Sequence, residues 1–260
     1  MTAAAAVIRE CRREFAARDR NLCSELTAGG AAITEWRHYP EGEVYDPRSH
    51  CQYFFHAHPR KGAPARTEQG HFHTFFRAEG MPAEVAPLLL PELAVADVPT
   101  VAPQAAPLKR GTRDEVSHLI AIAIDFRGEP FRLFTTNRWV TGETWYRAED
   151  VIAMLDRFAI AEQGSLWLLN RWISAMIQLY WPQIAALLRA RDRAVMSWRR
   201  RCRTHVFEDP RLEVTSSRDI DLDAQLAVVE RAPLGLPDRV QRRASALPPM
   251  ADGWDDGISG

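Results

Sequence analysis

Two short segments with alternating side chains constrain the fold of this chain more than any other feature. Residues 53–58 read Tyr-Phe-Phe-His-Ala-His, and residues 70–76 read Gly-His-Phe-His-Thr-Phe-Phe. Successive side chains of a β-strand point to opposite faces of a sheet, so each segment places histidines on one face and apolar residues on the other. The pattern predicts two antiparallel strands with one face in the core and a histidine-bearing face opposite it.

The spacing of the two segments suggests how they pair. If they form a hairpin about the middle of the loop, His58 faces His71 and His56 faces His73, and all four imidazoles share one face. A loop of this length does not fix the register, and a shift by one residue would place the two His-x-His pairs on opposite faces.

Four histidines on one face form a candidate metal site. Opposed Cβ atoms are about 4.5 to 5.5 Å apart, so opposed imidazoles can bind one ion at roughly 2.0 to 2.1 Å from each nitrogen. The predicted ligands are His56, His58, His71 and His73. Imidazole suits iron and zinc among other transition metals. Glu68 and Glu35 are candidate carboxylate ligands, and His118 is a candidate remote ligand. A metal-free catalytic or ligand-binding cluster, or a merely polar sheet face, are the alternatives.

The remaining sequence predicts an α+β fold: an antiparallel β-sheet or partly closed barrel of hairpins, covered by Trp-rich amphipathic helices. A helix is expected over residues 3–26, and a hairpin at 118–136 would oppose His118 to Asn137. Later elements are helices at 149–160 and 165–203, the second interrupted at Pro182, then a strand at 212–216 and a helix capped by Asp221, ending at 231.

The predicted divisions are an N-terminal helix at 1–30, a single domain at 31–232 with a Pro/Ala-rich crossing at 81–111, and a disordered tail at 233–260.

Composition excludes several classes of protein. The 33 basic and 34 acidic side chains leave a net charge of −1, which disfavours a protein that coats nucleic acid or an anionic membrane. Four scattered cysteines show no CxxC pair, so a disulfide framework is not expected. The sequence shows neither a secretory signal nor a membrane span, and we expect a cytoplasmic protein. Phosphate-binding loops, nucleophile elbows and HExxH helices are absent from the sequence.

Polar side chains gather at residues 135–143, where the second strand of the predicted 118–136 hairpin ends. Loops at strand ends commonly hold ligands, so Asn137 and Arg138 are predicted to orient a small anionic substrate. The alternative is a capped turn with Trp139 in the core.

Arginines gather at residues 189–203, around Trp198. Such a group is typical of a solvated helix face, or of a surface that binds a protein partner or a second copy of the chain. Binding of nucleic acid is not expected there.

Residues 36–46, the two His-x-His strands and residues 133–143 resemble an uncharacterised bacterial domain family of unknown function, over about residues 30–200. The resemblance implies no activity, cofactor or catalytic residue. The His-x-His pairs are also similar to those of cupins, but cupins take a later histidine from a second motif, and here a second pair follows too early.

The sequence thus predicts a metal-dependent enzyme acting on a small anionic molecule. An all-histidine site among aromatic strands favours an oxygen-handling non-haem iron oxidoreductase over a zinc hydrolase. The alternative is a non-catalytic binding or scaffold protein whose histidine face holds a structural metal or a ligand.

Overall fold

The sheet is built from strands that each pair with their neighbours in sequence. The computed structural model describes residues 1–27, 32–57, 68–88, 116–202 and 205–231. Among them, six antiparallel strands follow the order β1-β2-β3-β4-β5-β6, and the sheet does not close. The strands are β1 Tyr39–Tyr45, β2 Cys51–His56, β3 Glu68–Arg77, β4 Val116–Asp125, β5 Pro130–Thr136 and β6 Val214–Asp219. The predicted α+β class is confirmed, with an open sheet rather than a barrel.

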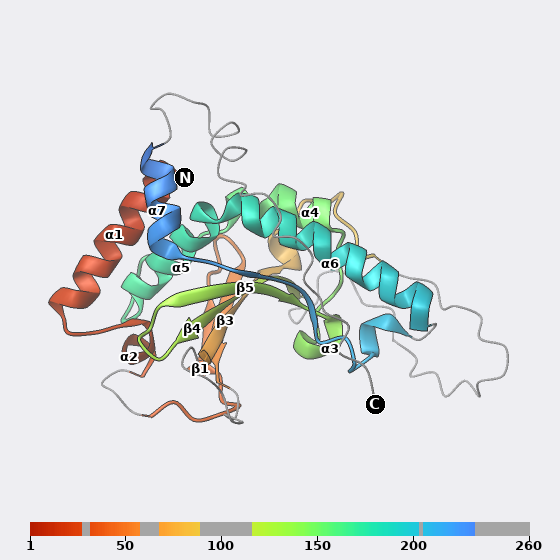
Figure 1. Ribbon diagram of the computed structural model, residues 1–260, viewed down its shortest axis with the longest axis horizontal. Coiled ribbons are helices and arrows are strands. Elements are labelled where there is room, and N and C mark those ends of the chain that lie inside the picture. The colour runs from red at the N-terminus through yellow and green to blue at the C-terminus, as the bar shows by residue number, and fades with distance from the viewer. Residues whose placement is uncertain (28–31, 58–67, 89–115, 203–204, 232–260) are drawn as a thin grey trace.

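Helices cover one face of this sheet (Figure 1). The helices of the described residues are α1 Thr2–Ala17, α2 Leu22–Leu26, α3 Arg138–Thr141, α4 Ala148–Met154, α5 Trp167–Leu179, α6 Trp181–Cys202 and α7 Leu222–Arg231. Short 3-10 turns occupy Ala78–Gly80, Leu155–Arg157 and Val206–Glu208. None of the helices among the described residues has the length and apolar character needed to cross a membrane.

The main core lies between the sheet and α1 and α5. Tyr53, Phe55 and Phe72 of β2 and β3 are fully buried in one cluster with Trp172 of α5 and Ile8 of α1. These strand residues are the alternate positions that the sequence assigns to the core face, so the inward side of the two strands is as predicted. The histidines of the same strands therefore point to the other face.

Proline and a capping aspartate set two helix boundaries where the sequence places them. The long helical region divides at Tyr180, and Pro182 is the second residue of α6, where its missing N–H costs no intrahelical bond. Asp221 precedes α7, and its Oδ1 accepts a hydrogen bond of 2.9 Å from the Ala224 N–H.

The single helix predicted over residues 3–26 is wrong, because the structure has two helices there. Asp19 has a φ of 52°, which α-helical backbone does not allow. Asn21 then starts α2 with a capping box, accepting from the Ser24 N–H at 2.9 Å. The spacing of apolar residues alone favours one continuous helix, whereas the local capping hydrogen bond of Asn21 starts a second one.

Parts of three predictions lie outside the described residues: most of the Pro/Ala-rich crossing, the tail from residue 233, and residues 28–30 of the predicted N-terminal division.

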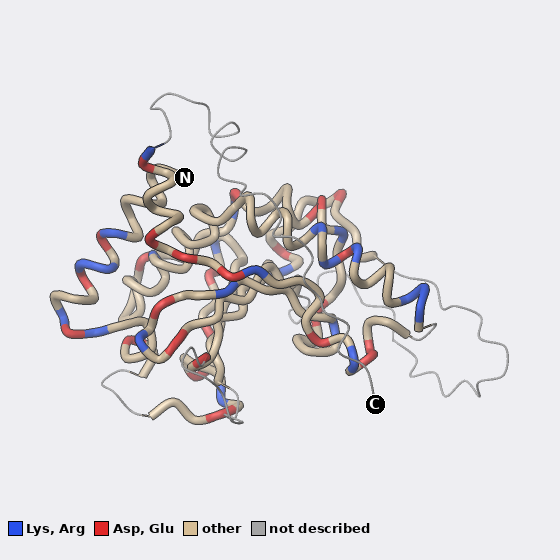
Figure 2. Tube along the Cα trace, in the orientation of Figure 1, with Lys and Arg blue, Asp and Glu red and all other residues tan. Residues whose placement is uncertain are grey.

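Basic side chains lie along α1 and α6 (Figure 2). In α6, Arg191 is buried, Arg189 is paired with Glu149 at 2.7 Å, and Arg193 and Arg200 are exposed. The interaction surface that the sequence suggests for this helix stays a prediction.

Candidate metal centre

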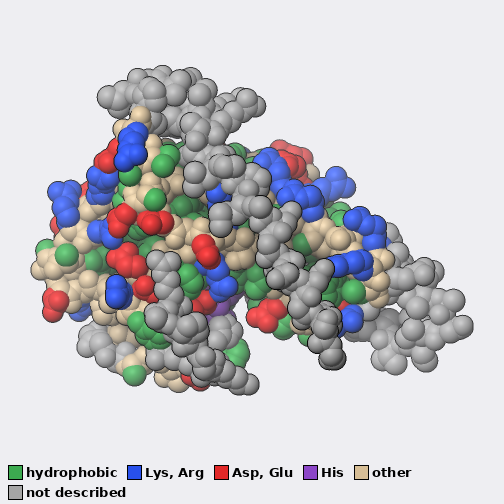
Figure 3. All heavy atoms as spheres, in the orientation of Figure 1, with side chains coloured by type: hydrophobic (Ala, Val, Ile, Leu, Met, Phe, Trp, Pro, Cys, Tyr) green, Lys and Arg blue, Asp and Glu red, His purple; other side chains and the backbone are tan. Residues whose placement is uncertain are grey.

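Three of the predicted histidine ligands converge on the sheet face away from the main core. One nitrogen from each of His56, His71 and His73 lies within 4.8 Å of the others. His71 and His73 are buried, with 4% and 1% of their surface exposed, and His56 is half-buried. On the face shown in Figure 3, histidine forms only a small patch. Neighbouring strands bring together the residue types that bind transition metals.

The predicted register of the two strands is wrong by two residues. His56 pairs with His71, and His73 pairs with Phe54. A shift by an even number preserves the faces, because side chains alternate with a period of two, so the three histidines still share one side. His58, the fourth predicted ligand, lies outside the described residues.

Gly70 permits this register. A Cβ at Gly70 would lie 2.3 Å from the His56 carbonyl oxygen and 2.5 Å from the Phe55 ring, closer than any side chain could approach. The glycine therefore lets β3 pack directly against β2 beside the His56–His71 pair. Gly70 is visible in the sequence, but its role depends on a contact that only pairing creates.

A carboxylate orients His71. Glu68 is hydrogen-bonded to His71 Nδ1, and Arg132 Nη2 donates to the other oxygen of Glu68 at 2.6 Å. Burial would raise the pKa of Glu68, but His71 and Arg132 outweigh it and lower the pKa, which keeps the carboxylate charged. With its proton on Nδ1, His71 directs the Nε2 lone pair toward His56 Nε2, 2.8 Å away. Metal-bound histidines in proteins are commonly held by such a carboxylate, so Glu68 serves as a partner of His71, whereas Glu35 is exposed in a turn.

His118 contacts Nδ1 of His73, as Glu68 contacts Nδ1 of His71. His118 Nε2 lies 3.0 Å from His73 Nδ1, and its Nδ1 lies 3.4 Å from Thr136 Oγ1. Burial, followed by the charges of Arg191 and His71, lowers the pKa of His118 to about 3, so this imidazole is neutral. A neutral His118 that donates to Thr136 accepts the His73 Nδ1 proton, which places the remaining lone pair of His73 on Nε2, the nitrogen that would bind an ion. His118, expected as a remote ligand, therefore lies behind His73, one of the predicted ligands.

Aromatic rings and small residues enclose the cluster. Phe54 lies 5.2 Å from His73 and Phe134 lies 5.0 Å from His71, both measured between ring centroids. Ala121 and Ala123 of β4 pair with His73 and His71, and their short side chains leave room beside the imidazoles. Apolar walls lower the local dielectric and strengthen the electrostatic interactions of a bound ion.

A second buried polar group adjoins His118. Glu143 is 1% exposed, and its Oε2 accepts from the His118 backbone N–H at 2.7 Å. Burial raises the pKa of Glu143 to about 8, despite the opposing charge of Arg191. Arg191 is equally buried, donates from Nη2 to the Tyr146 carbonyl at 2.6 Å, and lies 4.2 Å from the Trp145 ring centroid. Nothing in the sequence distinguishes Glu143 or Arg191 from ordinary surface charges.

Asn137 and Arg138 make contacts at the start of α3. The Asn137 side chain accepts from the Arg138 N–H at 2.9 Å and donates to the Val206 carbonyl at 2.7 Å. Arg138 donates from Nε to the Glu143 carbonyl at 3.1 Å and forms an ion pair with Glu208. Neither residue belongs to the histidine group, and their predicted role in orienting a substrate stays a prediction.

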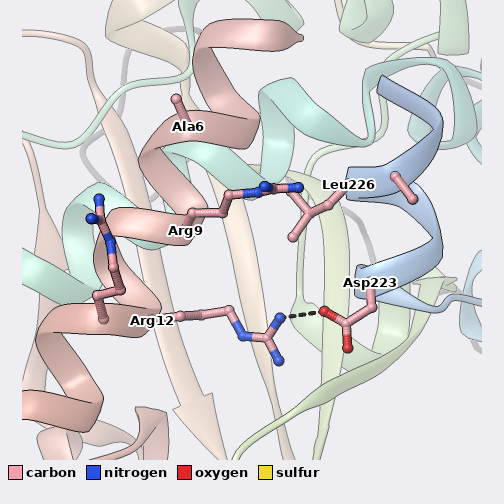
Figure 4. A pocket seen from close by; sticks show the side chains of 7 residues that line it. Ala6, Arg9, Arg12, Asp223 and Leu226 are labelled. Carbon is pink, nitrogen blue, oxygen red and sulfur yellow. Dashed lines mark hydrogen bonds and ion pairs between the residues drawn. The ribbon is translucent and has the colours of Figure 1, made fainter. Parts of the chain in front are cut away.

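Two cavities among the described residues lie away from the histidines. One, of about 720 Å³, separates α1 from α7 (Figure 4). Its Arg12 reaches Asp223 at 2.5 Å, and its Arg9 is paired with Glu230. A second, of about 280 Å³, lies between α1 and the β4–β5 turn at Gly128. Carboxylates already neutralise the arginines labelled in Figure 4, so the chemistry of this molecule is better sought at the histidines.

The family model for the domain of unknown function DUF6969 matches residues 2–220. No curated protein and no solved structure matches the chain. The expected resemblance to an uncharacterised family is confirmed, and the cupin resemblance is not among these findings.

Proposed function

Since the chain belongs to the DUF6969 family, whose description assigns no activity, we propose from the site itself that this protein binds a divalent transition metal through His56, His71 and His73 and is a metal-dependent enzyme. The convergence of three imidazole nitrogens, two of them on rings whose Nδ1 contacts the side chain of half-buried Glu68 or buried His118, carries this proposal. Such partners fix the tautomer that a metal requires.

The distances support one shared ion. Two nitrogens each about 2.05 Å from an ion and roughly at right angles to each other are about 2.9 Å apart. His56 Nε2 and His71 Nε2 are 2.8 Å apart, and His73 lies in the same group. A proton or a cation between these two nitrogens relieves the repulsion of their lone pairs, and the proposed ion would take that place.

Three protein ligands favour catalysis over a purely structural role. Structural zinc sites are closed by four protein ligands, whereas catalytic sites keep a position for water or substrate. The described residues supply three ligands, and neutral imidazoles leave the positive charge of the ion intact. Such an ion activates water or attracts an anion. Aromatic surroundings and all-nitrogen donors favour oxygen-dependent redox chemistry at iron over zinc hydrolysis.

Elemental analysis of purified, untagged protein tests the proposal. Wild-type protein grown with iron, zinc, copper and nickel salts should carry close to one ion per chain, and a His71→Ala/His73→Ala variant should carry almost none. His205→Ala is the matched control, because His205 is exposed and outside the group. Absence of stoichiometric metal from the wild type, or its retention by the double variant, would contradict the site.

A His58→Ala variant distinguishes the enzyme proposed here from the alternative, a scaffold protein with a structural metal. If it keeps the metal, and azide changes the visible spectrum of its Co²⁺ form, the ion has an open position. If removal of His58 releases the metal, four histidines close the site, and the structural alternative replaces the enzyme.

A further inference from the structure

Arg132 lies across one strand from His71. His71 pairs with Ala123 of β4, and Ala123 pairs with Arg132 of β5. Because the alanine between them has no bulk, the guanidinium can reach Glu68, to which it donates at 2.6 Å. Glu68 is hydrogen-bonded to His71, so one carboxylate separates Arg132 from a proposed metal ligand.

The guanidinium has binding capacity that the described structure does not use. Its Nε is buried and has no hydrogen-bond partner there, although 32% of the side chain is exposed. Its position is fixed by Glu68 and by the Phe134 ring, whose centroid lies 4.8 Å from Cζ. Buried donors nearly always have a partner, and a preorganised arginine fork matches the geometry of a carboxylate.

Arg132 also sets the charge of the site. Glu68 alone would cancel half of the charge of a divalent ion bound by neutral imidazoles. Arg132 compensates Glu68, so the site as a whole keeps the full charge of the ion. Apolar walls amplify that charge and favour an anion over a neutral molecule.

Building on the proposed metal site, we infer that Arg132 binds a carboxylate of the molecule that coordinates the ion, so that the ligands are small carboxylates with a second group for the metal. Arg132 thereby takes the recognition role that the sequence suggests for Arg138. The guanidinium serves binding and orientation, while the ion supplies the chemistry.

Full-length protein loaded with Co²⁺ provides a test that requires no known reaction. Succinate, which offers one carboxylate to the ion and one to the guanidinium, is titrated while the visible absorption of Co²⁺ is recorded. Succinamide is the neutral counterpart. Wild type, Arg132→Gln, Arg132→Lys and the control Arg189→Gln are compared at equal Co²⁺ occupancy, measured before and after titration. Arg189 is an exposed residue of α6 that is paired with Glu149.

Succinate should change the wild-type spectrum with saturation, and succinamide should need a much higher concentration. Arg132→Gln should raise the half-saturating concentration of succinate roughly tenfold, the loss expected for one charge-assisted hydrogen bond. Arg132→Lys, which keeps the charge but not the fork, should fall between the two and provides the comparison if Arg132→Gln does not load Co²⁺.

Equal half-saturation in wild type and both Arg132 variants, or equal responses to succinate and succinamide, would overturn the role of Arg132 and leave the metal site standing. A wild-type Co²⁺ spectrum that does not respond to succinate would likewise overturn the role of Arg132 and leave the metal site standing. Wild-type protein that takes up no Co²⁺ would overturn the metal site, and this inference with it.

Discussion

His73 Nδ1 lies 3.0 Å from His118 Nε2, which joins β3 to β4 through two buried imidazoles that are 45 residues apart in the chain. His118 is neutral, and in the tautomer that donates from Nδ1 to Thr136 its Nε2 accepts the proton of His73 Nδ1. The contact makes a buried strand residue the support of a proposed metal ligand, and it yields a direct test.

Replacing His118 by asparagine should weaken metal binding without abolishing it. Loss of a hydrogen-bond partner behind a ligand commonly costs 10- to 100-fold in metal affinity, because the ligand loses its fixed tautomer and orientation. Competition with a chelator of known affinity measures the effect. His205→Asn, at an exposed position, should leave the affinity unchanged. Equal affinities in His118→Asn and wild type would show that His73 does not depend on His118.

Glu68→Gln tests the corresponding support of His71. An amide keeps the size of the side chain but removes the charge that attracts both His71 and Arg132. Metal affinity should again fall by roughly 10- to 100-fold in the chelator competition. Glu79→Gln, an exposed substitution just beyond β3, should have no effect. Complete loss of metal from Glu68→Gln, with the fold intact by circular dichroism, would instead identify Glu68 as a ligand.

Glu143 should make stability decrease as the pH rises. Burial raises its pKa from the ordinary 4.5 to about 8, so between these values the folded protein binds a proton that the unfolded chain releases. His118 acts in the opposite sense below its ordinary pKa of 6.5, where the unfolded chain binds the proton instead.

The effect of Glu143 is therefore cleanest above pH 6.5. From pH 6.5 to 8 the unfolding free energy of the wild type should drop by on the order of 2 kcal/mol relative to Glu143→Gln, measured by urea denaturation. Glu149→Gln, at an exposed residue of α4, should follow the wild type. Parallel pH profiles for wild type and Glu143→Gln would show that Glu143 is charged in the folded protein.

Gly70→Ala should disturb the pairing of β2 and β3 at the proposed metal site. The new Cβ would collide with backbone and with a buried ring, and overpacking of this kind typically costs about 1 to 3 kcal/mol or more. Metal affinity should fall with stability, because His56 and His71 flank the collision. In Gly164→Ala the Cβ has open space, and only its φ of 75° opposes the substitution, at a cost of about 1 to 2 kcal/mol and with no loss of metal. If Gly70→Ala binds metal normally, the close approach is not needed for the site.

The sequence by itself determined the elements and their faces. Alternating aromatic and histidine residues assign Phe55 and Phe72 to the core and His56, His71 and His73 to the opposite side, because a strand has a side-chain period of two. Over residues 121–123 the hairpin around Gly128 has the predicted symmetric register, with Ala121 opposite Phe134, and a register shift follows at Ile124. Pro182 and Asp221 mark helix boundaries through local backbone chemistry, which needs no tertiary contact.

Only the tertiary structure decided which polar groups meet. The register of β2 and β3 depends on the close approach at Gly70. The carboxylate of Glu68 that holds His71 is itself bound by sequence-distant Arg132, and His73 contacts sequence-distant His118. Burial, which depends on the packing of all layers, keeps His118 neutral and raises the pKa of Glu143. Periodicity fixes the side to which a residue points, whereas long-range pairing and desolvation fix its partners and its charge.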